Sequence, residues 1–167
     1  MAIELGIPHG GWIPKGRLTE SGSLPEPYRL REMPTESWDA RTEQNVVDSD
    51  GTLIVSHGEL TGGSAYTMEM AAKHDRPCKH IDLEKTGAFA AVKAVQYWLD
   101  RQDIQELNVA GPRQSKDPEI YEAVKNLLKG LFYLDIVSAQ TGGPQRAMPL
   151  NTATVEEVVR DLVTTMP

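Results

Sequence analysis

The sequence predicts an α/β fold: a Rossmann-like open, mainly parallel sheet with helices on both faces. The first observation is the β-branched apolar run "GTLIVSHG" at residues 51–58, whose bounding glycines are typical of a strand buried on both sides. The second is the alternation of strand patterns with helical patterns over the rest of the chain, which favours right-handed parallel βαβ units. The length of 167 residues suits one core, so we expect a single domain over residues 1–167.

Composition limits the classes of partner. Charged residues make up 25% of the chain and the formal net charge is −7, which argues against a nucleic-acid surface because phosphate neutralisation needs a basic face. There is one cysteine, Cys78, and therefore no disulfide framework within the chain. No apolar run approaches the length of a membrane span, and no signal-peptide pattern opens the chain. We therefore expect a cytoplasmic protein without nucleic-acid or membrane partners.

The individual elements follow from local patterns. Residues 1–34 are rich in Gly and Pro and predict mostly irregular structure, and residues 37–48 predict a helix. After the strand at 51–58, helical spacing begins near residue 64, and a strand is expected at 77–83. A helix over 88–102 and a strand over 104–112 come next. The following helix is capped by Asp117 with Pro118 in its first turn, and it is expected to end near Gly130.

The C-terminal part, residues 131–167, predicts a strand, a loop and a helix. The run "LFYLDIVSA" contains the expected strand at 132–138, and "QTGGPQRAMPLN" forms the loop. In "TATVEEVVRDLV" the valines and the leucine share one helical face, and Thr154 with Glu157 fits a capping box.

Three glycine-containing loops follow predicted strands, at residues 56–67, 108–118 and 138–147. Because the carboxyl ends of parallel strands lie at one edge of a sheet, the three loops should lie together. Backbone N–H groups at helix N-termini, with Arg and Lys side chains, suit an anion there. None of the loops fits the P-loop or the full dinucleotide fingerprint, and no protein-ligated metal is expected. The candidate binding residues are Ser56, His57, Gly62, Gly63, Ser64, Thr67, Asn108, Gly111, Arg113, Ser115, Lys116, Gln140, Thr141, Gly142 and Arg146.

Several motifs together resemble the bacterial "putative molybdenum carrier" family. They are "AIELGIPHGGWIPKGRLTESGSLPEPYRLREMP", "RTEQNVVDSDGTLIVSHGELTGGSAYT", "PCKHIDL" and "LNVAGPRQSKDPEIYEAV", in the family's order and spacing over about residues 2–130. The resemblance implies a Rossmann-like cytosolic homo-oligomer whose glycine-rich loops hold a phosphate-bearing small molecule. That ligand would be the pterin of the molybdenum cofactor (molybdopterin) or a nucleotide.

The start of the chain departs from this family, whose members begin with a strand and a G-G-Q-T-G-x-D-R-A loop. A similar stretch, "DIVSAQTGGPQRA", occurs near the C-terminus, with Gln140, Thr141, Gly142 and Arg146 at the matching positions. Two explanations stay open. Either the strand at 132–138 fills the central slot of the sheet, by circular permutation or by strand exchange between chains, or the true N-terminus is missing and the tail is unrelated.

Two other functions compete with binding. The lysine-decarboxylase-like phosphoribohydrolases, which hydrolyse nucleoside monophosphates, share this fold and carry G-G-x-G-T-x-x-E. Here "GGSAYTME" keeps Gly62, Gly63 and Glu69 but has Ala65 and Tyr66 at the Gly and Thr positions, so the enzyme pattern is incomplete. The third reading is a structural subunit without a ligand.

Overall fold

A computed structural model of the chain describes residues 2–3, 6–19, 22–25, 27–140 and 150–151. Its centre is a five-stranded sheet in which every pair of neighbouring strands is parallel. The strand order is β1 (His9–Gly10), β9 (Leu150–Asn151), β8 (Leu107–Ala110), β6 (Gly51–Ser56) and β7 (Cys78–Asp82). The expected parallel Rossmann-like sheet is confirmed.

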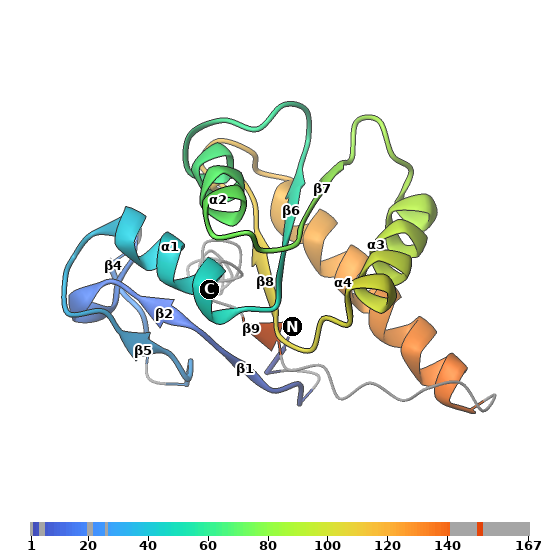
Figure 1. Cartoon of the computed structure of the whole chain (residues 1–167), viewed down its shortest axis with the longest axis horizontal. Helices are drawn as coiled ribbons and strands as arrows, with labels where there is room; N and C mark the ends of the chain where they lie inside the picture. The colour runs from blue at the N-terminus through green and yellow to red at the C-terminus, as the bar shows by residue number, and fades with distance from the viewer. Residues whose placement is uncertain (1, 4–5, 20–21, 26, 141–149, 152–167) are drawn as a thin grey trace, which may run out of the picture.

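Helices cover both faces of this sheet (Figure 1). On one face lie α1 (Trp38–Asp48) and α2 (Gly62–Lys73), and on the other lie α3 (Ala88–Gln102) and α4 (Ile120–Gln140). The bounds of α1 and α3 agree with the helices expected over residues 37–48 and 88–102. Among the described residues, every helix is too short or too polar to traverse a lipid bilayer.

The core forms around two strands that are buried along their whole length. All six residues of β6 and all four of β8 are buried, as their β-branched sequence predicts for the middle of a parallel sheet. Leu53 and Val55 pack with the apolar stripes of α3 and α4, whereas Val46 of α1 packs with Met70 and Ala71 of α2 in a smaller cluster. Each layer of helices therefore has its own apolar contact.

One glycine determines how the loop after β8 leaves the sheet. A Cβ atom on Gly111 would stand 2.8 Å from the Val55 carbonyl oxygen, closer than real Cβ contacts allow. Only glycine therefore lets the chain after β8 pass directly over the end of β6. This crossing places the residue 111–117 loop beside the residue 57–61 loop.

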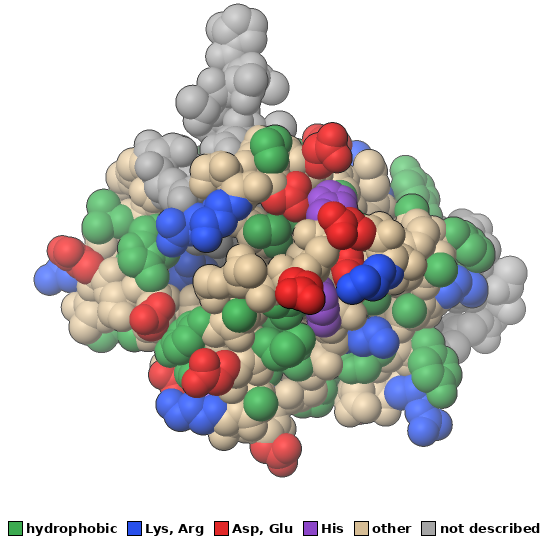
Figure 2. All heavy atoms as spheres, turned by 90° about the horizontal axis from the view of Figure 1, so that it is seen from above, with side chains coloured by type: hydrophobic (Ala, Val, Ile, Leu, Met, Phe, Trp, Pro, Cys, Tyr) green, Lys and Arg blue, Asp and Glu red, His purple; other side chains and the backbone are tan. Residues whose placement is uncertain are grey.

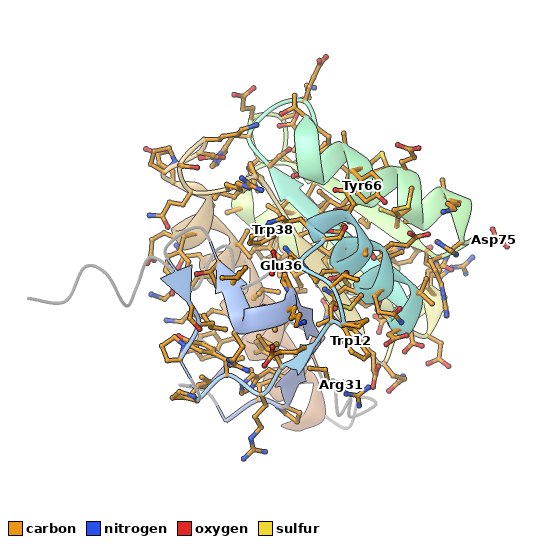
Figure 3. All side chains as sticks on the ribbon, turned by 90° about the vertical axis from the view of Figure 1, so that its left-hand side faces the viewer. Trp12, Arg31, Glu36, Trp38, Tyr66 and Asp75 are labelled. Atoms are coloured by element: carbon orange, nitrogen blue, oxygen red, sulfur yellow. The ribbon has the colours of Figure 1, made fainter. Side chains whose placement is uncertain are left out.

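The N-terminal segment forms two small sheets beside α1. Strands β2 (Trp12–Ile13) and β5 (Arg31–Glu32) pair in parallel, and β3 (Leu18–Thr19) pairs with β4 (Gly22–Ser23) across an antiparallel turn that follows a 3-10 helix at Lys15–Arg17. Asn45 binds both backbone groups of Trp12: its Oδ1 accepts from the N–H at 2.8 Å, and its Nδ2 donates to the carbonyl at 3.2 Å. These bonds fix the segment to α1, and Figure 3 shows Trp12 and Arg31 at that junction.

The expected strand at residues 132–138 is wrong, because α4 continues through it to Gln140. The helix end expected near Gly130 is wrong because this glycine serves the packing of two helices. A Cβ atom on Gly130 would lie 2.9 Å from Cγ2 of Val92, so this glycine allows α4 and α3 to approach closely instead of ending the helix. Leu131 is buried just after it, and Phe132 and Leu134 pack against the same core, so the apolar stripe runs on.

A later segment occupies the slot that the sequence assigned to residues 132–138. Strand β9 lies between β1 and β8, with Leu150 opposite Leu107 and Asn151 opposite Asn108 in parallel register. A C-terminal strand thus enters the sheet beside an N-terminal one. The expected loop residues 141–147 and the expected terminal helix in 152–163 lie outside the described residues.

We predict that Gly111→Ala lowers the free energy of unfolding by about 1–3 kcal/mol, because the added methyl group would overlap the Val55 carbonyl and force the two strands apart. Urea denaturation followed by circular dichroism measures this. Gly63→Ala is the matched control, since nothing lies within 4 Å of a Cβ atom at that position. Equal effects of the two substitutions would contradict the close contact.

We also predict that a chain ending at residue 140 melts at a lower temperature than one ending at residue 151. The shorter chain lacks β9, so the backbone groups that β1 and β8 direct toward it have no ladder partner. Differential scanning calorimetry of the two chains makes the comparison. Identical melting curves would show that β9 does not stabilise the sheet.

Candidate functional site

The N-terminus of α2 lies at the carboxyl edge of the sheet, one loop after β6. Thr61, the N-cap residue, has extended backbone angles but makes no side-chain capping bond, and Gly62 has φ +53°. The first N–H groups of an α-helix have no partner inside the helix, and they carry a partial positive charge. The side chain of the N-cap residue satisfies none of them, which suits this helix end to an anion.

Lys116 brings a full positive charge to this same helix end. Its Nζ lies 3.5 Å from the position that a Cβ atom on Gly62 would take. Within the described part of the chain, this ammonium makes no hydrogen bond or ion pair. A cation beside a helix N-terminus is electrostatically unfavourable, because both carry the same sign of charge. The pair is stabilised when an anion lies between them.

A wall of the site comes from the first turn of α1. Ser37 caps α1 by accepting the Ala40 N–H at 3.2 Å, and this cap places Trp38 and Arg41 on one side of the helix. The Arg41 guanidinium lies 5.5 Å from the centre of the Trp38 ring, and that of Arg113 lies 5.7 Å from it. Two cations thus meet one aromatic ring, and Figure 3 shows Trp38 on the same side of the molecule as Tyr66 of α2.

Two hydroxyl groups in the first turns of α2 behave differently. Thr67 Oγ1 donates to the Gly63 carbonyl at 2.8 Å, so it satisfies its own helix. Ser64 is only 5% exposed, and its Oγ has no hydrogen-bond partner within the described structure. Leaving a buried hydroxyl unsatisfied costs about 1–3 kcal/mol, so this atom is a ready donor for a ligand.

These groups surround one pocket of about 290 Å³. Three of its side chains are cations and one is a carboxylate, although the whole chain carries a net charge of −7. The local excess of positive charge, together with the helix N-terminus, suits a phosphate or a similar oxyanion. The lining residues are Trp38, Asp39, Arg41, Thr42, Thr61, Gly62, Gly63, Ser64, Tyr66, Thr67, Gly111, Pro112, Arg113 and Lys116.

A second, more open depression lies on the other side of Lys116. It is lined by Lys116 together with His57, Glu84, Asp117, Pro118 and Glu119. His57 Nδ1 lies 2.8 Å from Asp117 Oδ2, and the two side chains are 28% and 17% exposed. The imidazole therefore reaches the surface already paired with a carboxylate. Lys116 is the residue that both cavities share.

The turn that carries His57 is fixed by partly buried polar contacts. Asp82 Oδ1 accepts the Gly58 N–H at 2.9 Å, and Ser56 Oγ donates to the Gly58 carbonyl at 2.7 Å. Since that hydroxyl has one proton, it accepts from His80 Nε2, 2.8 Å away. Burial lowers the pKa of His80, so its ring stays neutral and donates this one bond.

Asp82 is the strongly shifted acid of this edge. The hydrogen bond from Lys85 is the larger cause and the one from the Gly58 backbone N–H is the next. Together they lower the pKa of Asp82 to about 2. Both donors stabilise the ionised carboxylate. Asp82 therefore holds the turn as an anion over the whole neutral range.

The structure brings together some of the expected site residues. Gly62, Gly63, Ser64, Thr67, Gly111, Arg113 and Lys116 all line the pocket. His57 lines the neighbouring depression, and Ser56 lies buried beneath the turn. Their part in binding remains a prediction.

Asn108, Ser115 and Glu69 do not line the pocket, and the remaining expected residues are at the end of α4 or outside the described residues. Asn108 is buried and donates from Nδ2 to Thr52 Oγ1 at 3.2 Å, so it joins β8 to β6 in the core. Ser115 is exposed and lies outside the pocket lining. Gln140 ends α4, and Thr141, Gly142 and Arg146 lie outside the described residues. Glu69, which the enzyme reading requires, is exposed on α2 and is absent from the pocket wall.

Sequence reasoning missed the contribution of α1 and the Asp117 contact. The helix expected over residues 37–48 agrees with α1, but nothing local showed that its first turn would face α2. Tyr66 was considered only as a departure from the enzyme motif. The spacing of His57 and Asp117, 60 residues apart, carries no sequence signal at all.

Among the described residues, no group of three or more His, Cys, Asp or Glu side chains could hold a metal ion. Burial raises the pKa of the Cys78 thiol to about 11, which keeps it protonated and unsuited to metal ligation.

The fold and this pocket define a class: a Rossmann-like protein with an anion-type pocket at the carboxyl edge of a parallel sheet. Residues 1–132 match the circularly permutated YpsA SLOG family, and the chain belongs to that family. Of the two explanations left open for the start of the chain, the family's permuted order supports circular permutation, although the strand assigned to residues 132–138 was misplaced.

One solved structure supports the same relationship. The crystal structure of a "putative molybdenum carrier protein" from Syntrophus aciditrophicus SB is 53% identical in sequence, with a TM-score of 0.77. The match covers 78% of this chain and 82% of that one. The expected resemblance to this family is confirmed. A comparison with curated proteins finds no match.

We predict that the effect of Asp82→Asn on stability fades in acid. Because the folded pKa of about 2 is below the ordinary aspartate value of 3.8, the ionised carboxylate stabilises the fold above about pH 4, and this contribution is lost as the pH falls through about 2. The difference in melting temperature between wild type and variant should be constant near neutrality and shrink from pH 4 to pH 2. Asp75→Asn is the exposed control, because Asn tolerates the left-handed backbone there. A difference that does not change with pH would contradict this role.

Proposed function

We propose that this protein binds an anionic, phosphate-bearing small molecule in the pocket at the N-terminus of α2. The observation that carries the proposal is the position of the Lys116 ammonium, 3.5 Å from where a Cβ atom on Gly62 would stand, in a pocket that also holds the Ser64 hydroxyl, which has no partner among the described residues. Positive charge, helix N–H groups and a buried hydroxyl donor are the complement of a phosphate group.

The pterin of the molybdenum cofactor and a nucleotide are the two ligands that we propose. Each joins a phosphate to a planar aromatic ring. The pocket has two aromatic side chains, Trp38 and Tyr66, beside its cations, and such side chains can pack against a flat ring. Similarity to a solved protein described as a molybdenum carrier supports the pterin, which would be carried cargo and not a cofactor of a reaction.

The proposal includes a homo-oligomer working in the cytoplasm. Three aromatic side chains of α3 and α4 support the assembly, because they are largely exposed although aromatic residues are enriched in interfaces. They are Phe89 at 72%, Tyr97 at 65% and Tyr133 at 68% exposure. Sedimentation velocity tests this part, and a single species at monomer mass would contradict it.

Lys116→Gln should weaken binding of AMP at least about 10-fold, since a hydrogen bond to a charged group contributes about 1.5–3 kcal/mol. Ser64→Ala should act in the same direction with a smaller effect. Titration calorimetry with AMP measures the affinity, and a raised melting temperature with AMP gives an independent readout.

Lys93→Gln is the matched control, because it removes the same charge from an exposed position on α3, away from the pocket lining. Inorganic phosphate and molybdate are titrated alongside AMP. If none of the three binds, the proposed function fails. If molybdate binds and AMP does not, the site takes a bare oxyanion instead of a phosphate ester.

A further inference from the structure

The pairing of His57 with Asp117 sets the chemistry of the depression beside the pocket. A carboxylate can only accept a hydrogen bond, so His57 Nδ1 must carry the proton in the 2.8 Å contact. In a neutral imidazole the other nitrogen then has a free lone pair. With a neutral ring, His57 Nε2 is thus a hydrogen-bond acceptor, and His57 makes no further polar contact in the described structure.

Both partners are held before any ligand arrives. His57 directly precedes Gly58, whose N–H and carbonyl are bound by Asp82 and Ser56 and whose φ of +82° favours glycine. Asp117 is fixed from its other side, because its Oδ1 accepts the Glu119 N–H at 3.2 Å at the start of α4. Little conformational freedom is left for a ligand to remove, which favours binding.

The other histidines of the edge and of α2 are already engaged. His80 Nε2 is bound to Ser56, and His74 Nε2 lies 2.7 Å from Glu43, far along α2. His9 belongs to β1, and its Nε2 is buried. His57 is the histidine that combines a carboxylate partner with a partly exposed ring beside the anion pocket.

The two cavities differ in charge. The pocket at α2 has Arg41, Arg113 and Lys116 against one carboxylate, whereas the depression has the carboxylates of Glu84, Asp117 and Glu119 around His57, with Lys116 at the border. Figure 2, which looks onto this edge, shows Lys and Arg side chains close to a group of acidic and His side chains. A phosphate is attracted to the first cavity and repelled by the second, which prefers hydrogen-bond donors.

We propose that the ligand is a phosphate ester with hydroxyl groups, such as a sugar phosphate or the sugar-phosphate part of a nucleotide. It lies across Lys116, with its phosphate at α2 and a hydroxyl donating to His57 Nε2. The inference rests on the proposed function, because it takes the phosphate position from there. It adds a second contact point that sets apart hydroxylated esters from bare oxyanions.

The test compares three probes by titration calorimetry: ribose 5-phosphate, inorganic phosphate and O-phosphoethanolamine. Wild type should bind ribose 5-phosphate roughly 5-fold more tightly than inorganic phosphate, as expected for one added neutral hydrogen bond. His57→Phe keeps a ring but removes the acceptor, so it should abolish this preference and leave the phosphate affinity unchanged. His57→Gln, whose amide oxygen can accept, should recover part of it.

The outcomes separate the two proposals. If inorganic phosphate binds but ribose 5-phosphate binds no more tightly, the hydroxyl subsite is wrong and the proposed function stands. A preference that survives His57→Phe also overturns the subsite. If O-phosphoethanolamine binds more tightly than ribose 5-phosphate, the acidic depression selects a cation instead. If no probe binds, both proposals fail. Should the Phe variant not fold, the Gln variant and wild type still decide the question.

Discussion

The close contact of Gly111 with the Val55 carbonyl is the constraint on which the rest of the site depends. It lets the chain after β8 cross the end of β6 without a side chain between them, and the following loop then carries Lys116 and Asp117 across the same edge. Lys116 meets the N-terminus of α2, and Asp117 meets His57. A wider crossing would separate each pair, because both pairs join the loop after β8 to the loop after β6.

This dependence explains which parts the sequence could predict. The apolar sequences of β6 and β8 by themselves predict strands that are buried on both faces. The rule that ligands bind at the carboxyl edge holds for open parallel sheets in general. Together they were enough to place Gly62, Ser64 and Lys116 at one edge. They could not place Trp38 or Arg41, because the side of α1 that faces the pocket depends on its packing against α2, which no local pattern records. The same is true of the contact between His57 and Asp117.

Gly130 shows how a correct rule gives a wrong element. Glycine near the end of a helical pattern usually marks a C-terminus, and the apolar run after it looks like a strand. Here the glycine leaves room for Val92 of α3, and α4 continues for another 10 residues to Gln140. One of the two explanations left open, that a strand from the C-terminal part fills a slot in the sheet, agrees with the position of β9 between β1 and β8. Backbone hydrogen bonds require that a strand is present, not that it comes first in the chain, and β9 meets that requirement.

Charge connects the fold to the function. The chain as a whole is acidic, yet three cations meet at one helix N-terminus, and three carboxylates gather on the other side of Lys116. Side chains of like sign held this close repel one another. The ligand that we propose, with a phosphate at one end and hydroxyl donors at the other, would relieve the repulsion in the first cavity and satisfy acceptors in the second. Such a ligand would stabilise the fold, because a ligand that prefers the folded state adds its binding free energy to that state.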